Sequence, residues 1–143
     1  MLVAERRWLD TSAILSWIFD EPGGEQVEAA LMEADETGTP LLASEWSRVE
    51  VVYGLVRHDR ETWDFCWRIV RDAPLEWVAL SEEESVAAGQ LRAEYKMSTA
   101  DSAIVTQAAA HGCELWHKDP EFDSLPENFV KVKRLPYKKR RKK

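Results

Sequence analysis

The sequence predicts an α/β/α sandwich, in which helices cover both faces of a central parallel sheet of four to five strands. Two observations support this fold class. Short apolar runs alternate along the chain with longer segments whose apolar residues repeat at the helical period. Strands that are separated by helices pair in parallel, because each helix carries the chain back to the starting end of the sheet. The 143 residues, 45% of them hydrophobic, suffice for one such domain.

The first half of the chain holds two predicted strands and two helices between them. Residues 7–9 form a short apolar run that ends at Asp10, and the pattern then changes to the helical period over residues 11–19. A Pro-Gly-Gly turn separates this helix from the next one, which we expect at residues 25–34. The apolar run at residues 41–43 is the second predicted strand.

A helix is expected to begin at Ser44, a good N-cap residue, and to continue to about Arg57. Its apolar side chains repeat at helical spacing, so we expect them to face the core. These side chains are Trp46, Val49, Val52, Tyr53 and Val56.

A further helix, at residues 61–72, carries apolar side chains on two sides. Phe65 and Ile69 lie opposite the stripe that we expect to face the core. Because this helix has more apolar surface than one core contact requires, the sequence predicts a protein interface here, most simply that of a homodimer. The core-facing stripe consists of Trp63, Cys66, Trp67 and Val70.

The second half of the chain adds three predicted strands and two helices. The strands are expected at residues 77–80, 113–117 and 129–132, the last of which would be the fifth of the sheet. The helices are expected at residues 81–95 and 98–111. Each helix opens with a Ser-x-x-Glu or Ser-x-x-Asp pattern, which is typical of a capping box.

Charge is distributed unevenly along the chain, whose net charge is −7. Residues 131–143 hold nine basic side chains and no acid, so residues 1–130 carry 10 basic and 26 acidic side chains, a net charge of −16. We therefore predict a folded domain at residues 1–134 and a basic, disordered tail at residues 135–143. A nucleic acid could approach so acidic a body through bound cations or through this tail. The tail residues that could contact RNA phosphates are Lys138, Lys139, Arg140, Arg141, Lys142 and Lys143.

Neither a membrane span nor a signal peptide is predicted. No uninterrupted apolar run approaches the ~20 residues that cross a membrane, and the N-terminal MLVAERRWLD has no apolar stretch long enough for a signal peptide. Cys66 and Cys113 lie far apart and without neighbouring cysteines, which argues against a disulfide scaffold or a zinc site. We therefore expect the protein to act in the cytoplasm, with no membrane partner.

Four acidic residues fall where a parallel sheet gathers its functional groups. Asp10 and Asp119 each follow a predicted strand, and Asp101 lies in the first turn of the helix between these strands. The carboxyl ends of parallel strands form one edge of the sheet, so all three could converge there. Glu50 is the fourth candidate, because it flanks the apolar face of its helix, where a carboxylate is partly desolvated. Clustered carboxylates repel one another unless a cation joins them, and oxygen ligands alone favour Mg²⁺ or Mn²⁺.

Each of these acids also has a purely structural interpretation. Asp10 and Asp119 could cap the helical turns that follow them, and Asp101 could be the acid of a capping box. Glu50 could be a solvated charge at the edge of its helix. The coincidence of all four positions favours a functional cluster.

The segments around the four acids resemble, in order and spacing, the motifs of the PIN domain family, and within it the VapC-type toxin ribonucleases. The segments read LDTSAIL at residues 9–15, EVVYGL at 50–55, TADSAI at 99–104 and DPEFD at 119–123, and they cover nearly the whole chain. The resemblance implies a Mg²⁺- or Mn²⁺-dependent endoribonuclease with a PIN-like fold. It also implies a homodimer and an antitoxin partner, which could inhibit by placing an Arg or Lys in the acidic site.

The resemblance assigns a role to each acid. Asp10, Glu50, Asp101 and Asp119 would be the metal-binding and catalytic quartet, with Ser12 as a supporting polar residue.

The sequence departs from the family pattern at one position. The family usually has a Thr two positions before its last acid, and this chain has His117 there. Asp123 is therefore an alternative metal ligand to Asp119.

The expected reaction is hydrolysis of RNA phosphodiester bonds by metal-activated water, since no Ser/His/Asp or Cys/His set stands out in the sequence. Two other Mg²⁺-dependent classes fit poorly, because a phosphoacceptor receiver needs an adjacent acid pair after the first strand and a haloacid-dehalogenase-type enzyme needs Asp-x-Asp. This chain has Asp10-Thr11-Ser12. An RNA-processing PIN nuclease outside a toxin-antitoxin system and a non-catalytic acidic binding module are the remaining alternatives. Metal-dependent RNA cleavage by the pure protein would exclude the binding module.

Overall fold

A computed structural model describes residues 6–136 and contains five strands, six α-helices and one 3₁₀ helix. In chain order the elements are β1 (Arg7–Leu9), α1 (Thr11–Ile18), α2 (Gly24–Thr37), β2 (Leu41–Ser44), α3 (Glu45–His58), α4 (Trp63–Asp72), β3 (Leu75–Val78), α5 (Glu82–Glu94), α6 (Thr99–Ala110), β4 (Glu114–His117), η1 (Pro120–Ser124) and β5 (Val132–Arg134).

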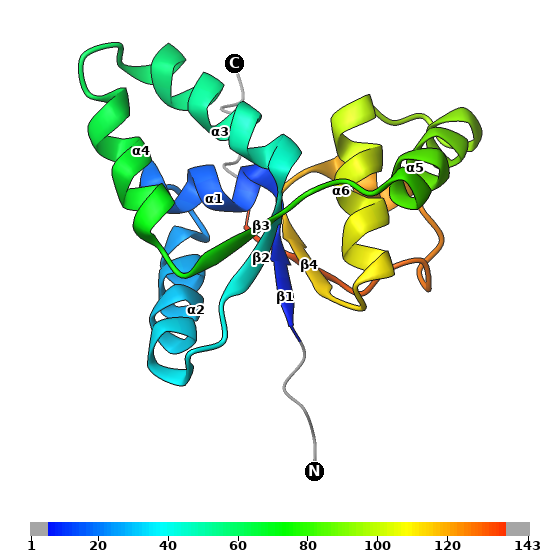
Figure 1. Ribbon diagram of the computed structural model, residues 1–143, viewed down its shortest axis with the longest axis horizontal. Coiled ribbons are helices and arrows are strands. Elements are labelled where there is room, and N and C mark those ends of the chain that lie inside the picture. The colour runs from blue at the N-terminus through cyan, green and yellow to red at the C-terminus, as the bar shows by residue number, and fades with distance from the viewer. Residues whose placement is uncertain (1–5, 137–143) are drawn as a thin grey trace, which may run out of the picture.

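The strands form one sheet in the order β3-β2-β1-β4-β5, and every pairing is parallel. Helices α1 to α4 lie on one side of this sheet and α5 and α6 lie on the other (Figure 1). The predicted α/β/α sandwich is confirmed, and its fifth strand is present. Because β1 is central, the residues that follow it lie between the ends of β2 and β4.

Two hydrophobic cores, one on each face, hold the helices against the sheet. Successive residues of a strand point to opposite faces, so Leu9 joins the core under α1 and α2, whereas Trp8 joins the core under α5 and α6. Both side chains are fully buried. Leu42 faces the same side as Trp8, and its neighbour Ala43 faces the side of Leu9. At these positions β1 and β2 are therefore apolar on both faces, as strands buried on both sides must be.

Several helix starts follow the predicted capping residues. Ser44 accepts a hydrogen bond from the N–H of Trp46 at the start of α3. Ser81 and Glu84 form a complete capping box at the start of α5, because each side chain accepts the other's backbone N–H. These pairs satisfy N–H groups that have no partner inside the helix.

The strand bounds in the second half differ from the expected ones. The third strand, β3, begins at Leu75 and ends at Val78, because pairing with β2 starts as soon as the chain leaves α4. The N–H of Leu80, which we expected to lie in this strand, donates to the Glu45 carboxylate at 2.8 Å. The fifth strand begins at Val132, two residues after Val130 has entered the core.

The predicted buried face of α3 is wrong. The structure buries Ser47, Val51 and Leu55, and it leaves exposed several members of the expected face, Val49 (68%) and Tyr53 (62%) among them. Both sets repeat at helical spacing. The face of smaller side chains packs inward because α3 lies close to α1, where a Cβ at Gly54 would lie 3.3 Å from the Leu15 side chain.

The two apolar sides of α4 are confirmed. Val70 is buried, and the other three members of the predicted stripe pack partly buried against the core. Phe65 is 65% exposed and Ile69 is 41% exposed on the outer side. Within residues 6–136, this outer side has no covering element that would explain its apolar character.

The folded domain extends slightly further than the predicted boundary at residue 134. Leu135 is 1% exposed, and its N–H donates to the carbonyl of His117 at 2.8 Å, which continues the pairing of β5 with β4. The predicted RNA-contacting residues Lys138 to Lys143 lie outside the described residues. Within residues 6–136, no helix is both long and apolar enough to cross a membrane.

Gly24, the first residue of α2, packs directly against α1. A Cβ at this position would lie 2.4 Å from the carbonyl oxygen of Ser16, so α1 and α2 would have to separate. We predict that Gly24→Ala lowers the free energy of unfolding by about 1–3 kcal/mol, measured by urea denaturation. Gly89→Ala is the control, because this position on α5 faces open space, and it should raise that free energy by up to about 1 kcal/mol. Equal stability of the two variants would contradict the prediction.

Candidate active site

Asp10 lies at the carboxyl end of the central strand and is the most buried acid of the site. Its backbone N–H donates to the carbonyl of Trp116 on β4 at 3.0 Å, and its side chain is the N-cap of α1. The oxygen Oδ2 accepts hydrogen bonds from the Ser12 N–H at 3.2 Å and from the Ser12 hydroxyl at 2.5 Å. With 3% of its surface exposed, this carboxyl group is held in one orientation.

Ser12 connects the ends of two strands. Its hydroxyl donates to Asp10 and accepts the backbone N–H of Lys118 at 2.9 Å. Lys118 directly follows β4, so this hydroxyl fixes the distance between the turns that follow β1 and β4.

Glu50 reaches the same edge of the sheet from α3. The hydroxyl of Thr11 donates to its carboxylate at 2.7 Å. Thr11 is the first residue of α1 and follows Asp10, so this bond joins α3 to the site. The negative charge of Glu50 acts on the carboxyl group of Asp10, as the pKa described below shows.

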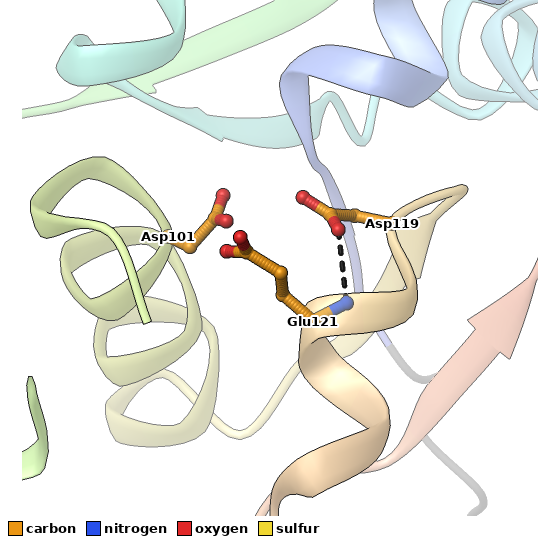
Figure 2. A group of neighbouring side chains, drawn as sticks. All are labelled: Asp101, Asp119 and Glu121. Atoms are coloured by element: carbon orange, nitrogen blue, oxygen red, sulfur yellow. Dashed lines mark hydrogen bonds between the residues drawn. The ribbon is translucent and has the colours of Figure 1, made fainter. Parts of the chain in front are cut away.

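Three further carboxylates converge beside Asp10. Asp101 points from the first turn of α6 toward Asp119, which precedes η1, and Glu121, which lies on η1, as Figure 2 shows. One carboxylate oxygen of each residue lies within 4.8 Å of the others. Asp119 also caps η1, because its Oδ1 accepts the N–H of Glu121 at 2.9 Å. Ser98 caps α6 by accepting the Asp101 N–H, but the Asp101 side chain turns to the cluster instead of completing the predicted capping box.

The carboxyl groups of Asp10 and Asp101 have raised pKa values, because burial and neighbouring negative charges disfavour their ionised forms. Burial raises the pKa of Asp10 from 3.8 to about 6; hydrogen bonds from Ser12 lower it, and the charges of Glu50 and Asp119 raise it. Burial also raises the pKa of Asp101, to about 9, and a hydrogen bond with Glu121 and the charges of Asp10 and Asp119 act in the same direction. Without a cation, the site therefore holds a proton at neutral pH.

His117 occupies the position where the family pattern has Thr. Its side chain is buried, and its Nδ1 accepts the backbone N–H of Asp119 at 3.1 Å. Burial lowers the pKa of this imidazole, although the nearby Asp123 and Asp119 charges act to raise it. His117 is therefore neutral at neutral pH, with its proton on Nε2, and it holds the turn that carries Asp119.

The structure brings most of the expected residues together. Asp101 and Asp119 lie close together. The charges of Glu50 and Asp119 raise the pKa of Asp10, and the charge of Asp10 raises that of Asp101. The alternative ligand Asp123 lies apart from this cluster and forms an ion pair with Arg134 at 3.0 Å.

Glu121 was not among the expected site residues. Its position two residues after Asp119 was the available signal, because the N–H at this position binds an Asp cap and thereby sets the direction of the side chain.

The structural interpretation of the acids is correct in part, and their functional interpretation stays a prediction. Asp10 and Asp119 cap helical turns, as their structural interpretation required, and they do so with one oxygen each. Carboxylate oxygens are the donor set that hard divalent cations prefer, and charge repulsion among them is what such a cation relieves. Asp10, Glu50, Asp101, Asp119 and Glu121 could thus hold Mg²⁺ or Mn²⁺.

Solved structures with a similar fold include several complexes. VapBC2 from Rickettsia felis bound to a DNA fragment from its promoter matches with a TM-score of 0.74 and 18% identity, over 91% of this chain and 98% of that one. DNA-bound VapBC from Salmonella typhimurium matches with a TM-score of 0.70 and 17% identity, over 91% of this chain and 98% of that one. FitAcB from Neisseria gonorrhoeae matches with a TM-score of 0.65 and 16% identity, over 88% of this chain and 95% of that one. At sequence identities this low, the similarity shows a shared fold and nothing more.

No curated protein matches the sequence as a relative. The family model that does match describes the PIN domain, and it covers residues 8–128, from β1 to beyond η1. This match spans most of the sequence and includes all four predicted acids, and the chain therefore belongs to the PIN domain family.

Proposed function

We propose that the protein is a metal-dependent endoribonuclease and the toxin of a toxin-antitoxin pair. The observation that carries this proposal is the convergence of carboxylates from β1, α3, α6 and η1 at one edge of the sheet in a PIN domain. Within residues 6–136, no Lys or Arg forms an ion pair with Asp10, Glu50, Asp101 or Asp119. A divalent cation would supply the missing positive charge.

The residues of the site have separate tasks in the proposed hydrolysis. Asp10, Glu50, Asp101 and Asp119 would hold Mg²⁺ or Mn²⁺, and a bound ion of this kind polarises a phosphoryl oxygen and makes water a better nucleophile. Ser12 keeps Asp10 in place through its two hydrogen bonds. The Nδ1 of His117 accepts the Asp119 N–H, and burial lowers the pKa of the ring, so His117 serves to position the Asp119 turn and is a poor base for the attacking water.

RNA as the substrate is supported by the exposed face of α3. Trp46 lies four residues before Glu50 and Tyr53 three residues after it, which places all three on one side of the helix. Trp46 is 37% exposed and Tyr53 is 62% exposed. Arg57 donates to the Tyr53 hydroxyl at 3.2 Å and adds a positive charge beside the ring. Aromatic side chains next to cations are a common platform for the bases of single-stranded nucleic acids.

Protein partners are supported by the outer side of α4. Phe65 and Ile69 are exposed there, and Ile69 and Met32 line a groove between α4 and α2. Toxin-antitoxin complexes occur among the structures with a similar fold. We propose an antitoxin and a second copy of the chain as partners, and the cytoplasm as the compartment.

The decisive experiment is incubation of the pure protein with total RNA. Cleavage that requires Mg²⁺ or Mn²⁺ and stops with a chelator, followed by mapping of the new RNA ends, would support the endoribonuclease. Intact RNA under all conditions would favour a non-catalytic binding module. Cleavage without any effect of a co-purified or co-expressed antitoxin would favour an RNA-processing nuclease.

We predict that Asp10→Asn and Asp101→Asn each lower the rate of RNA cleavage by about 100-fold or more, because a neutral amide replaces a charged metal ligand. Isothermal titration should show weaker Mn²⁺ binding to both variants. Asp35→Asn, at an exposed position on α2, is the control and should cleave at the wild-type rate. Full activity of either site variant would refute the assignment of that residue.

We predict that the metal-free protein loses stability as the pH rises. The pKa of Asp10 is raised on folding from 3.8 to about 6, so the neutral form stabilises the fold below pH 3.8 and this contribution is lost as the pH rises through 6. In a chelator at about pH 8, Asp10→Asn should exceed the wild type by up to about 3 kcal/mol in free energy of unfolding. The difference should shrink toward zero at about pH 4. A difference that does not vary with pH would contradict this.

We predict that replacing Phe65 and Ile69 by Ser disrupts a protein interface without unfolding the domain, because both side chains are exposed. Sedimentation at micromolar concentration should show a dimer for the wild type and a monomer for the double variant. A wild-type monomer that captures its antitoxin, together with a variant that does not, would assign this surface to the antitoxin. Wild-type behaviour of the variant in both assays would exclude α4 as an interface.

A further inference from the structure

We propose that the pocket beside the start of α3 is a nucleobase subsite, in which one base of a single-stranded RNA stacks on Trp46. This inference rests on the proposed endoribonuclease activity and adds to it the place where a base of the substrate is held. The pocket has a volume of about 530 Å³, within the range of roughly 300–1,000 Å³ that small-molecule sites occupy. Its lining residues are Glu45, Trp46, Arg48, Val49, Leu80 and Ser85.

The pocket adjoins the acidic residues through α3. Trp46 lies one helical turn before Glu50 on the same side of the helix, a separation of about 5–6 Å between Cβ atoms. The Thr11 hydroxyl donates to Glu50 at 2.7 Å and to the buried hydroxyl of Ser47 at 3.1 Å. Thr11 directly follows Asp10, so the pocket and the acids are fixed to one another. An RNA chain whose base lies against Trp46 therefore carries its adjoining phosphates past the acids.

The opposite wall of the pocket, the segment between β3 and α5, is anchored from two sides. From α3, the Glu45 carboxylate accepts the N–H of Leu80 at 2.8 Å. From α6, the Nε2 of the fully buried Gln107 donates to the carbonyls of Val78 and Ala79 at 3.2 and 3.3 Å. A segment that is anchored at three consecutive residues keeps its shape, so a ligand does not have to open the pocket before it binds.

The lining of the pocket matches the chemistry of a nucleobase. Trp46 offers an exposed ring, and Val49 and Leu80 add apolar surface, which suits the flat faces of an aromatic heterocycle. The Oε1 of Glu45 accepts the Leu80 N–H, and within residues 6–136 its Oε2 has no hydrogen-bond partner. The Ser85 hydroxyl donates to a backbone carbonyl and keeps its lone pairs as acceptors. Both oxygens can accept the N–H groups at the edge of a base.

Arg48 supplies the positive charge that a nucleotide favours. Its guanidinium lies over the Trp77 ring, 5.5 Å from the ring centroid, which restricts its position. In the part of the chain that the structure describes, no acid forms an ion pair with Arg48. Residues 1–130 nevertheless carry 26 acidic and only 10 basic side chains. An arginine without an acidic partner on so acidic a body favours a phosphate-bearing ligand over an apolar protein segment.

The test combines a protein variant with a substrate that lacks one base. A cleavage site of the wild type is mapped in total RNA with Mn²⁺, and a single-stranded oligonucleotide spanning it is made. Each nucleotide beside the cleaved bond is then replaced in turn by an abasic one. We expect one replacement to lower kcat/KM of the wild type about tenfold, as the loss of a base stack would. Trp46→Ala should cleave the intact oligonucleotide about tenfold less efficiently, and the same replacement should then cost it less than about twofold.

Further variants control for stability and for charge. Trp46→Leu keeps an apolar side chain against the domain and should behave like Trp46→Ala, also where the latter does not fold. Trp46→Phe keeps a ring and should retain the cost of base removal. Arg48→Gln should raise KM about threefold. Arg92→Gln, the same change at an exposed position near the other end of α5, should leave KM unchanged.

The outcomes separate the subsite from the function on which it rests. Absence of metal-dependent RNA cleavage by the wild type would overturn both. Cleavage in which the effects of Trp46→Ala and base removal multiply, at every abasic position, would overturn the subsite and leave the nuclease intact. The subsite would also be overturned if Trp46→Ala converted a dimer into a monomer in sedimentation while its abasic costs equalled those of the wild type. That result would assign the pocket to a protein partner.

Discussion

The hydrogen bonding of one buried carboxyl group, that of Asp10, underlies the whole arrangement. This residue ends the central strand, pairs with β4 through its backbone and starts α1 through its side chain. Its partner Ser12 carries the connection on to the turn after β4. Together with the bond from Thr11 to Glu50, this link connects the segments that bear Glu50 and Asp119. A group that is costly to charge therefore determines where the other charges of the site lie.

The double use of these acids follows from the chemistry of a carboxylate, which has two oxygens. A helix N-terminus needs an acceptor for its free N–H groups, and one oxygen suffices for that purpose. Asp10 and Asp119 each cap a turn with one oxygen. Capping fixes the side-chain angle, and the partial positive charge of a helix start lowers the cost of the negative charge. One carboxylate can therefore cap a helix with one oxygen and bind a cation with the other.

Much of the fold could be predicted from local patterns, because strands buried on both faces are apolar and helix starts carry caps. The buried face of α3 could not, since two faces obey the same period and only close contact with α1 at Gly54 distinguishes them. The positions of the four predicted acids in the fold followed from the order of the motifs along the chain. Whether those residues bind metal stays a prediction. Glu121 was missed although the Asp119 cap before it could be foreseen, because the buried His117 also holds this turn, and that burial is not visible in the sequence.

The division of the interior into two cores affects how the protein can lose its function. Glu50 belongs to a helix on one face of the sheet and Asp101 to a helix on the other, and β1 is the strand that both cores share through Leu9 and Trp8. Opening either layer separates one of these two acids from the rest of the site, even while the opposite layer stays folded. A protease that begins to open the chain from one face would therefore disrupt the site before it cuts the first peptide bond.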